Sequence, residues 1–430
     1  MSSRLKALTR SPLTARFIVG KTFRIAHQDP PISSIVRILY HHRTQGEEPE
    51  SIHIKAIVDA LGALGHEVLV VGPAAIQHQG ARGSRPSLLG RIKNAAPRLL
   101  FELMQLGYNI VVAHRLAKAI KQFKPHLVYE RYALFNFAGV RVAKRYGIPL
   151  ILEVNTPYAQ AWAKYYGLYL KTLARWLEKR ILLAASHIIT VTEVQRELLV
   201  HEGIPPQQIS TCHNAIDPDW FNPERHLNPD LAAELGLMAP VIGFVGTMNR
   251  WQGMSEFPAV LRSVFARCPE ATFLFVGDGE FRQSLEDVCV SEGFSDRVVF
   301  TRRKPHADVP PLVALMDITV LLNSNAYGSP MKIFEYMAMG KAIVAPSVAP
   351  VLEVLHDGQT GLLIEPGDTT EMADQIVRLI RDPALRDRLG KAGRAYVTKH
   401  HTWHQNALKI VSIYGQQTLA TASKESASTC

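Results

Sequence analysis

The sequence contains little cysteine and no long apolar segment. Its four cysteines form no CxxC pair and no paired spacing, which argues against a zinc site or a disulfide framework and favours a reducing, cytoplasmic setting. No run of about twenty apolar residues occurs, so we expect no transmembrane helix. Residues 1–35 are basic but lack the apolar core and cleavage site of a secretory signal. We expect them to form a poorly ordered or surface-associated extension.

Positive charge is abundant, and it is unevenly distributed. The net charge of +10 would suit nucleic acid, an anionic membrane or a phosphorylated small molecule. Residues 80–124 hold nine Lys or Arg and a single acid, Glu102, interleaved with leucines. This pattern fits helices packed on a core with solvated basic faces, or an amphipathic surface that docks on a membrane. Nucleic acid is not expected, because no binding motif or aromatic stacking platform accompanies the charge.

Short apolar runs alternate with helix-length segments in two series along the chain. This alternation is typical of parallel, doubly wound sheets. A cluster of Pro and Asn at residues 214–223 interrupts it, and we place a linker there. The first series has predicted strands at 36–39, 68–71, 126–129, 150–154 and 187–191, with helices at 52–64, 137–145 and 170–184. The second has predicted strands at 241–245, 272–276, 298–300, 318–322 and 343–345.

The predicted fold class is therefore α/β, with two Rossmann-like, doubly wound domains that face one another across a cleft. Ligands of such sheets bind at the carboxyl ends of the strands. The predicted parts are an extension (1–35), a first domain (36–215), a second domain (216–400), a helix that crosses back to the first domain (401–420) and a tail (421–430).

The strongest local signal is the segment NAYGSPMKIFEYMAMGKAIVA at residues 325–345. A Gly-Ser-Pro turn precedes a helix that we expect to begin at about Met331 and to end at Gly340. The start of such a helix presents backbone N–H groups and a positive dipole end, which suit a diphosphate. Lys332 adds a full charge there. Glu335, one turn further along, could accept hydrogen bonds from ribose hydroxyls.

This segment resembles glycosyltransferase family 4, a group of retaining enzymes with the two-domain GT-B fold. The resemblance covers most of residues 36–415. It is supported by the segment EVLHDGQTGLLI at 353–364 and by the linker. It implies that the first domain binds the acceptor and the second the nucleotide sugar, with a UDP-sugar or GDP-sugar as donor, no cofactor and no bound metal. The donor-binding residues that it implies are Gly246, Thr247, Gly277, Asp278, Gly279, Arg303, Tyr327, Gly328, Ser329, Pro330, Met331, Ile333 and Glu335.

The sequence departs from the family pattern at two places in this implied site. The family carries two glutamates around the turn; Glu335 matches the second, whereas Tyr327 stands where the first is expected. The family also places an Arg and a Lys on the diphosphate, at positions occupied here by Thr247 and Gln252. Prepositioned cations lower the barrier to departure of a nucleoside diphosphate. The candidates are Lys332, then Arg250, which could equally be an ordinary exposed loop arginine, and then Arg303.

The first domain should supply the acceptor site from loops that follow its strands. In retaining transfer the leaving phosphate itself could accept the acceptor's proton, so a side-chain base is not required. Glu153 lies near a predicted strand end, where an ion-pair role that stabilises the fold is equally compatible with its position. The candidates are His41, Gly46, Glu130 and Arg131 for acceptor binding, and Glu153 and Asn155 for catalysis beside Lys332 and Arg250.

Metal and dinucleotide motifs are weak in this sequence. Asp217 and Asp219 match an Asp-x-Asp pattern, but they lie in the linker, where Asp-Pro is a common turn former. No histidine spacing completes a metal site. No GxGxxG motif precedes a helix, so a NAD-dependent dehydrogenase is disfavoured.

The sequence therefore predicts a retaining glycosyltransferase that moves a sugar from a nucleoside diphosphate sugar to a glycan or lipid-linked acceptor. A bacterial polysaccharide or glycolipid pathway is the expected setting. The expected location is cytoplasmic, with peripheral contact to the inner face of an anionic membrane. Two alternatives remain: a nucleotide-sugar epimerase, and a catalytically inactive scaffold or regulatory subunit.

Overall fold

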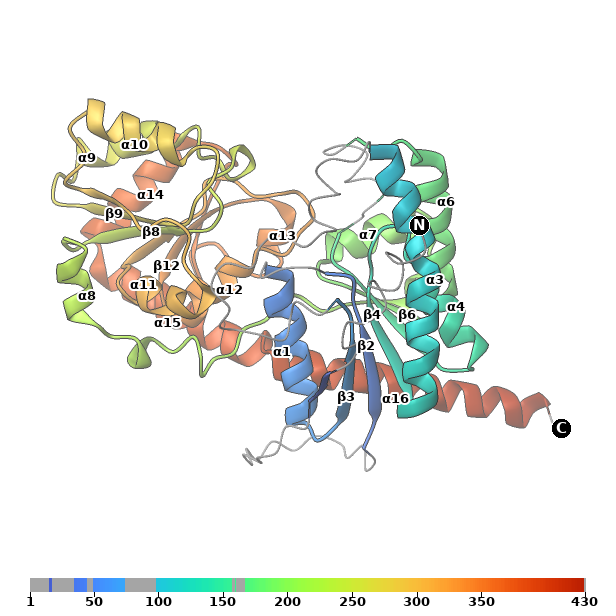
Figure 1. Cartoon of the computed structure of the whole chain (residues 1–430). Helices are drawn as coiled ribbons and strands as arrows, with labels where there is room; N and C mark the ends of the chain where they lie inside the picture. The colour runs from blue at the N-terminus through green and yellow to red at the C-terminus, as the bar shows by residue number, and fades with distance from the viewer. Residues whose placement is uncertain are drawn as a thin grey trace. The chain divides into compact units, whose positions relative to one another are not determined.

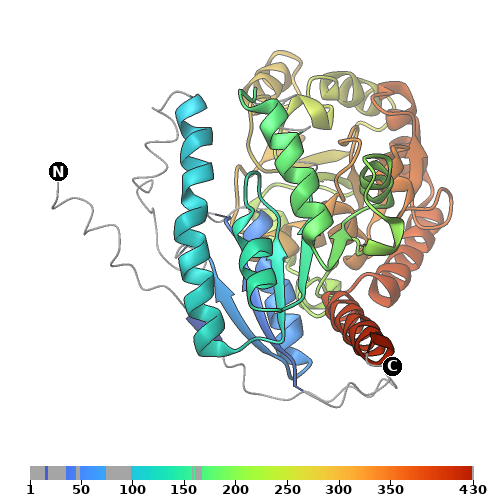
Figure 2. The ribbon, with the colours of Figure 1, turned by 90° about the vertical axis from the view of Figure 1, so that its right-hand side faces the viewer.

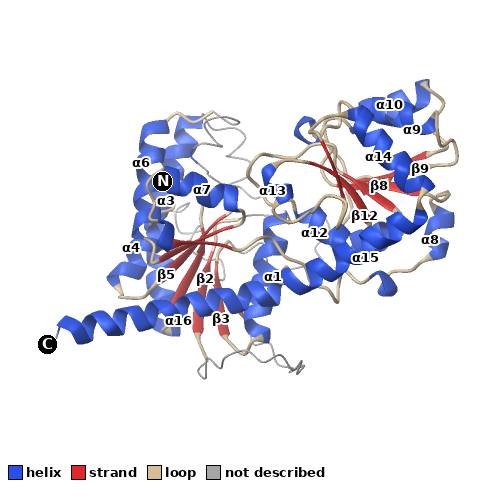
Figure 3. Cartoon of the chain, turned by 180° about the vertical axis from the view of Figure 1, so that it is seen from behind, coloured by secondary structure: helices blue, strands red, loops and turns tan. Residues whose placement is uncertain are grey.

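The computed structural model of the chain describes residues 15–17, 35–44, 49–73, 98–156, 159 and 167–428. The described chain divides into two compact units. The first unit holds the residues up to Val191, Gln195–Cys212 and the chain from His404 onward. The second holds Thr192–Val194 and His213–Trp403. Each unit is a sheet covered by helices on both faces, as Figures 1 and 3 show.

The first unit is built on a seven-stranded sheet. Its strands are β1 (Ala15–Phe17), β2 (Arg37–His41), β3 (Glu67–Val71), β4 (Leu127–Arg131), β5 (Leu150–Val154), β6 (His187–Thr190) and β7 (Ile209–Thr211). The spatial order is β1-β3-β2-β4-β5-β6-β7. Strands β2 to β7 pair in parallel, and β1 pairs antiparallel with β3 at the edge. The chain order reverses between β2 and β4, which creates a switch point there.

Helices cover both faces of this sheet, and the two faces differ in polarity. The helices are α1 (Pro49–Ala63), α3 (Arg98–Phe123), α4 (Ala138–Arg145), α6 (Lys171–Ala184), α7 (Glu193–His201) and α16 (Trp403–Ser428). Under α3, α4 and α6 the sheet presents an apolar core that includes Leu39, Val128 and Leu152. The opposite face, under α1 and α16, carries Tyr129 and Glu153. Because side chains alternate along a strand, Leu152 and Glu153 point to opposite faces.

The second unit contains a six-stranded parallel sheet in the order β10-β9-β8-β11-β12-β13. Its strands are β8 (Val241–Val245), β9 (Thr272–Val276), β10 (Val298–Phe300), β11 (Ile318–Val320), β12 (Ala342–Pro346) and β13 (Leu362–Ile364). Every residue of β8, β9, β11 and β12 is buried. Central strands of a parallel sheet are covered on both faces, which explains why these strands are continuous apolar runs.

Helices also enclose the second sheet. They are α8 (Pro229–Glu234), α9 (Phe257–Phe265), α10 (Arg282–Ser291), α11 (Val309–Ala314), α12 (Met331–Ala338), α13 (Ala349–Leu352), α14 (Thr369–Arg381) and α15 (Pro383–His400). Helices α9, α10 and α14 lie on one face, and α11, α12 and α15 on the other (Figures 1 and 3). The core between them is rich in Phe, Ile and Val, including Phe244, Phe257 and Phe275.

Some elements differ from the sequence-based expectation. Strand β1 lies inside the predicted extension 1–35 and is the one antiparallel strand described, so the first sheet is not wholly parallel. Strands β7 and β13 were not predicted, and several strand ends move by one or two residues because hydrogen-bond pairing, not composition, sets them. Among the described helices, none is long and apolar enough to cross a membrane.

The change of unit falls between Cys212 and His213, just before the boundary that we placed after residue 215. The predicted crossing helix corresponds to the start of α16, whose residues from His404 belong to the first unit.

Candidate functional site

The loops after β8, β9, β10 and β11 meet at the carboxyl edge of the second sheet. Strands β8 and β11 are neighbours in this sheet, but the chain leaves β8 toward β9 and leaves β11 toward β12. Their loops therefore diverge at the switch point, which is where open α/β sheets bind ligands. The residues that the sequence assigns to the donor lie on these loops and at the start of α12.

Glycines allow the loops after β8 and β9 to touch. Gly246 and Gly277 have φ of 139° and 145°, a region that side chains rarely adopt. A Cβ on Gly277 would lie 1.9 Å from the carbonyl oxygen of Gly246, and one on Gly279 would lie 2.6 Å from the backbone of Met248. The Met248 N–H donates to the Asp278 carbonyl at 2.9 Å, which ties the loops together. A rigid floor of backbone results.

The turn before α12 is held by two asparagines. Asn325 Oδ1 accepts hydrogen bonds from the backbone N–H groups of Tyr327 and Gly328. The side chain of Asn214, in the linker, donates to the Ser329 carbonyl at 2.9 Å. Pro330 then precedes α12, and no side chain caps the helix. The helix start is thus fixed in place while its positive end remains open to a ligand.

Lys332, in the first turn of α12, points across to the loop after β8. Its Nζ donates to Oε1 of Gln252 at 2.5 Å and lies 4.2 Å from the centre of the Phe244 ring. A Cβ on Gly246 would lie 2.6 Å from this ammonium, so the glycine leaves room for it. Burial lowers the pKa of Lys332 to about 7, and the nearby Glu335 charge partly opposes this shift. No carboxylate of the described residues forms an ion pair with this ammonium, which leaves its charge available to a bound anion.

This geometry explains the departure at position 252. A lysine there would place a second cation against Lys332, whereas the Gln252 amide oxygen accepts its hydrogen bond. The hydrogen bond from Lys332 to the buried Gln252 and its contact with the buried Phe244 ring take the place of the water molecules that would otherwise surround the ammonium.

Glu335 lies one turn further along α12 and is 8% exposed. Its Oε1 accepts a hydrogen bond from Nε2 of His306 at 3.2 Å. His306 comes from the loop after β10, and its ring packs on Phe221 at 5.7 Å between centres. His306 therefore orients the carboxylate, and Oε2 has no hydrogen-bond partner among the described residues. A carboxylate fixed in this way can accept from a pair of ligand hydroxyls.

The other predicted donor residues line the same edge with less direct contact. Thr247, Arg250 and Arg303 are exposed. The Arg250 guanidinium lies 5.5 Å from the centre of the Phe281 ring, and Arg250 N–H donates to Glu280. Asp278 Oδ1 accepts from Nε of Arg282 at 2.9 Å. Ile333 is buried in the core under the helix, so only its backbone can reach a ligand.

In the first unit, Glu153 lies at the centre of a buried polar network. Its carboxylate accepts hydrogen bonds from Tyr129 Oη at 2.6 Å, Arg131 Nη1 at 2.7 Å and Asn155 Nδ2 at 2.5 Å. His53 Nε2 lies 3.1 Å away. Burial alone would raise the pKa of Glu153, but His53, Arg131 and Tyr129 hold it well below its usual range. All four groups stabilise the ionised carboxylate, which is an arrangement suited to holding strands and α1 together.

The acceptor candidates are divided between two buried pairs. Glu130 Oε2 accepts from Nδ1 of His41 at 2.5 Å, and Glu130 is wholly buried. Arg131 belongs to the Glu153 network instead. A Cβ on Gly139 would overlap the Glu130 carboxylate, so this carboxylate lies against the first turn of α4. Gly46 lies outside the described residues.

Sequence reasoning missed His306, Gln252 as a partner of Lys332, and Asn325. The signal that could have found them is position: all three follow strands of one parallel sheet at its carboxyl edge. Among the described residues, no group of three or more His, Cys, Asp or Glu is placed to hold a metal ion.

Comparison with known proteins gives this architecture a family. The model of "Glycosyl transferases group 1" matches residues 239–382, and that of "Glycosyltransferase Family 4" matches residues 51–220. The chain belongs to glycosyltransferase family 4. The resemblance that residues 325–345 indicated is thus confirmed, together with the predicted fold class of its two doubly wound units.

Two relatives and one solved structure illustrate how far the similarity extends. Alpha-D-kanosaminyltransferase of Streptomyces kanamyceticus is 25% identical over 57% of this chain, and the match spans 64% of that relative's length. The 2-deoxystreptamine glucosyltransferase of the same organism is 26% identical over 83% of this chain and 96% of the relative. The Anabaena Alr3699/HepE structure in complex with UDP-glucose has a TM-score of 0.64 at 17% identity, covering 90% of this chain and 100% of that one. That likeness shows a shared fold.

Proposed function

We propose that this family 4 protein transfers a sugar from a nucleoside diphosphate sugar, with UDP-glucose the first donor to test, to a glycan or lipid-linked acceptor. The anomeric configuration of the sugar would be retained, as in its family. The UDP-glucose complex of the similarly folded Anabaena protein supports the choice of donor. Polysaccharide or glycolipid synthesis is the proposed setting.

The arrangement at the start of α12 carries this proposal. A helix N-terminus without a side-chain cap and the Lys332 ammonium lie at the switch point of the sheet, where a diphosphate would lie. Glu335, oriented by His306, lies one turn further along the helix, where its carboxylate could accept from the ribose hydroxyls of the same nucleotide. As the glycosidic bond breaks, the departing diphosphate gains negative charge, and these groups stabilise that charge. In this scheme the protein stabilises the diphosphate without a metal ion.

Replacing Glu335 by Ala should weaken nucleotide binding by about 1.5–3 kcal/mol, since one charge-assisted hydrogen-bonding group is lost. That change corresponds to roughly ten- to hundredfold in Kd. Isothermal calorimetry with UDP, GDP, ADP and their common sugars measures it, with NAD as a ligand control. Selective binding of one nucleotide, lost in the variant, would name the base of the donor.

The matched control is Glu234→Ala, because Glu234 is an exposed glutamate on α8 of the same unit. It should bind the nucleotide as the natural protein does. Equal affinity in Glu335→Ala and the control would move the donor site elsewhere. If no nucleotide binds the natural protein at all, the inactive-scaffold alternative becomes the better account.

We also propose peripheral contact with an anionic membrane through α3 and α6. Of the basic segment 80–124, the structure describes residues from Arg98 onward as one unbroken helix (cyan in Figure 2). Its first turns expose Leu99, Leu100, Leu103 and Met104 by 36–50%. On α6, Trp176 is 52% exposed, and exposed cations surround it: Lys171, Arg175, Lys179 and Arg180.

The two helices form one surface because Glu102 joins them. Its carboxylate accepts the backbone N–H groups of Tyr169 and Leu170 at 2.8 Å each, at the start of α6. The single acid of the basic segment is therefore buried as a cap for α6 and does not reduce the positive surface. Apolar side chains with a cationic rim are typical of helices that lie in a membrane interface.

The double substitution Leu100→Glu/Leu103→Glu should reduce sedimentation with phosphatidylglycerol vesicles about tenfold or more, since it removes two apolar side chains and adds repulsive charge. Leu352→Glu in the second unit is the control, because Leu352 is 46% exposed and Leu100 is 48% exposed. Vesicle binding that is equal in all three proteins would refute this surface. Absence of binding by the natural protein would refute membrane contact altogether.

A further inference from the structure

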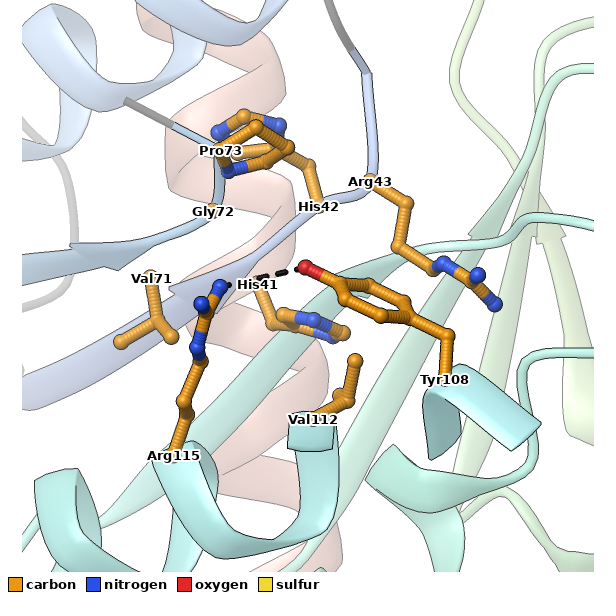
Figure 4. Close-up of a pocket in the computed structure, with 9 residues that line it drawn as sticks. All are labelled: His41, His42, Arg43, Val71, Gly72, Pro73, Tyr108, Val112 and Arg115. Carbon is orange, nitrogen blue, oxygen red and sulfur yellow. Dashed lines mark hydrogen bonds between the residues drawn. The ribbon is translucent and has the colours of Figure 1, made fainter. Parts of the chain in front are cut away.

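A pocket at the carboxyl edge of the first sheet is lined by several basic side chains. Its walls come from the ends of β2 and β3 and from the middle of α3 (Figure 4). The lining residues are His41, His42, Arg43, Val71, Gly72, Pro73, Tyr108, Val112 and Arg115. The site described above in the second unit shares none of them.

Two arginines are positioned on either side of Tyr108. The Arg115 Nη1 donates to the Tyr108 hydroxyl at 3.1 Å (Figure 4). The Arg43 guanidinium stacks over the Tyr108 ring at 4.8 Å from its centre and donates to Gln105 Oε1 at 2.5 Å. These neutral partners orient both guanidinium groups, and neither arginine forms an ion pair within the described chain.

Arg43 is the more constrained of the two arginines. Its Nη1 is buried and has no hydrogen-bond partner among the described residues. Burial lowers the pKa of Arg43 from its ordinary value, so its charge is held at an energetic cost, and Glu130 offsets only part of that cost. The Glu130 carboxylate is already hydrogen-bonded to His41. A buried donor without a partner next to a second cation is expected to be satisfied by an anion.

His42, beside these arginines, lines the pocket but carries no charge at physiological pH. Burial, with His41 and Arg131 nearby, lowers the pKa of His42 to about 3, so its ring is neutral at physiological pH. A Cβ on Gly72 would overlap this ring, which shows how closely the glycine lets β3 approach it. The positive charge of the pocket therefore comes chiefly from Arg43 and Arg115.

We propose that this pocket binds a phosphate group, held by Arg43 and Arg115 against Tyr108. On the proposed glycosyltransferase function, on which this step rests, the phosphate belongs to the acceptor, and the protein selects acceptors that carry one. Planar guanidinium groups fixed by an aromatic ring match the geometry of phosphate oxygens. The position at the carboxyl edge, next to the switch point between β2 and β4, is where this sheet is expected to take a ligand.

Calorimetry with glycerol 1-phosphate tests the pocket in full-length protein carrying Lys332→Ala, which removes the cation that a probe molecule would contact at the donor site. Arg115→Gln and Arg43→Gln, added singly, should each weaken binding about tenfold or more. Arg141→Gln, on the exposed face of α4, is the matched control and should change nothing. Thermal unfolding of each variant establishes that it folds.

The outcomes separate this proposal from the proposed function. UDP affinity, measured in proteins with Lys332 intact, should be the same with and without Arg115→Gln. If the natural protein does not bind UDP, the donor proposal alone is refuted. Glycerol 1-phosphate affinity that is equal in Arg115→Gln, Arg43→Gln and Arg141→Gln would overturn the pocket. The protein could instead bind vesicles of phosphatidylcholine with phosphatidic acid but not glycerol 1-phosphate. If Arg115→Gln and Arg43→Gln each abolish that vesicle binding, the phosphate that the pocket recognises is carried by a lipid. Binding of neither probe overturns the proposal.

Discussion

Lys332→Ala is expected to slow transfer about 10²- to 10³-fold in kcat, the range found when one donor to a developing negative charge is removed. The ammonium is held by Gln252 and Phe244 at the switch point of the sheet, where the departing diphosphate would lie. Its interaction with the diphosphate strengthens as the glycosidic bond breaks, so the loss should fall on kcat more than on donor KM. Steady-state kinetics with the donor identified by calorimetry measures both.

The same lysine predicts a pH dependence. In the protein without donor, burial lowers the pKa of Lys332 to about 7, so the charged form is lost as the pH rises through that value. Because the charged form binds the diphosphate, kcat/KM should fall above about pH 7. A bound diphosphate favours the charged form, so kcat itself should hold to higher pH. Lys332→Ala should lack this alkaline decline.

Lys341 provides the matched control for both measurements. It is a second lysine of the same unit whose pKa burial lowers, here to about 8. It directly precedes β12, at the amino edge of the sheet and so at the end opposite to Lys332, and its Nζ donates to the Ala314 carbonyl. Lys341→Met should retain kcat within about twofold, since no reacting group is touched. An equal loss of kcat in both variants would indicate a general structural effect and contradict the role given to Lys332.

Glu153→Ala is expected to lower the free energy of unfolding of the first unit by about 3–5 kcal/mol, because it leaves buried groups without their charge partner. Arg131, Tyr129 and His53 all face this carboxylate. Hydrogen exchange of the β4, β5 and β6 amides measures the effect within the first unit, which avoids assuming that the two units unfold together. A stability loss of this size would identify Glu153 as a structural residue.

The exposed Glu197 on α7 of the first unit is the control, and Glu197→Ala should change stability by less than about 0.5 kcal/mol. The pH dependence adds a second check. Since the folded protein holds the pKa of Glu153 below its unfolded value, its stabilisation is present above the usual carboxyl range and is lost as the pH falls. Glu153→Ala should therefore lose less stability on acidification than the natural protein. Unchanged stability with abolished transfer would instead favour the catalytic interpretation that the sequence left open.

The sequence alone determined the features of this protein that depend on neighbouring residues. Strands β5, β8 and β9 begin and end where the apolar runs do, because strands buried on both faces carry few polar positions. Helix α12 begins at Met331 and is ended by Gly340, whose φ of 64° suits glycine. The chemistry of that turn is local, so Lys332 and Glu335 could be assigned to one ligand site before the structure was known.

Only the tertiary structure decided what those residues contact. Gln252, the partner of Lys332, is 80 residues away along the chain, and His306, the partner of Glu335, is 29 residues away. The contacts of Glu153 with Tyr129 and Arg131 likewise depend on how the strands pair in the sheet. The order of strands in a sheet, including the antiparallel pairing of β1, is set by packing between distant segments. Composition and spacing do not predict that order, because the apolar pattern of each strand is compatible with many neighbouring strands.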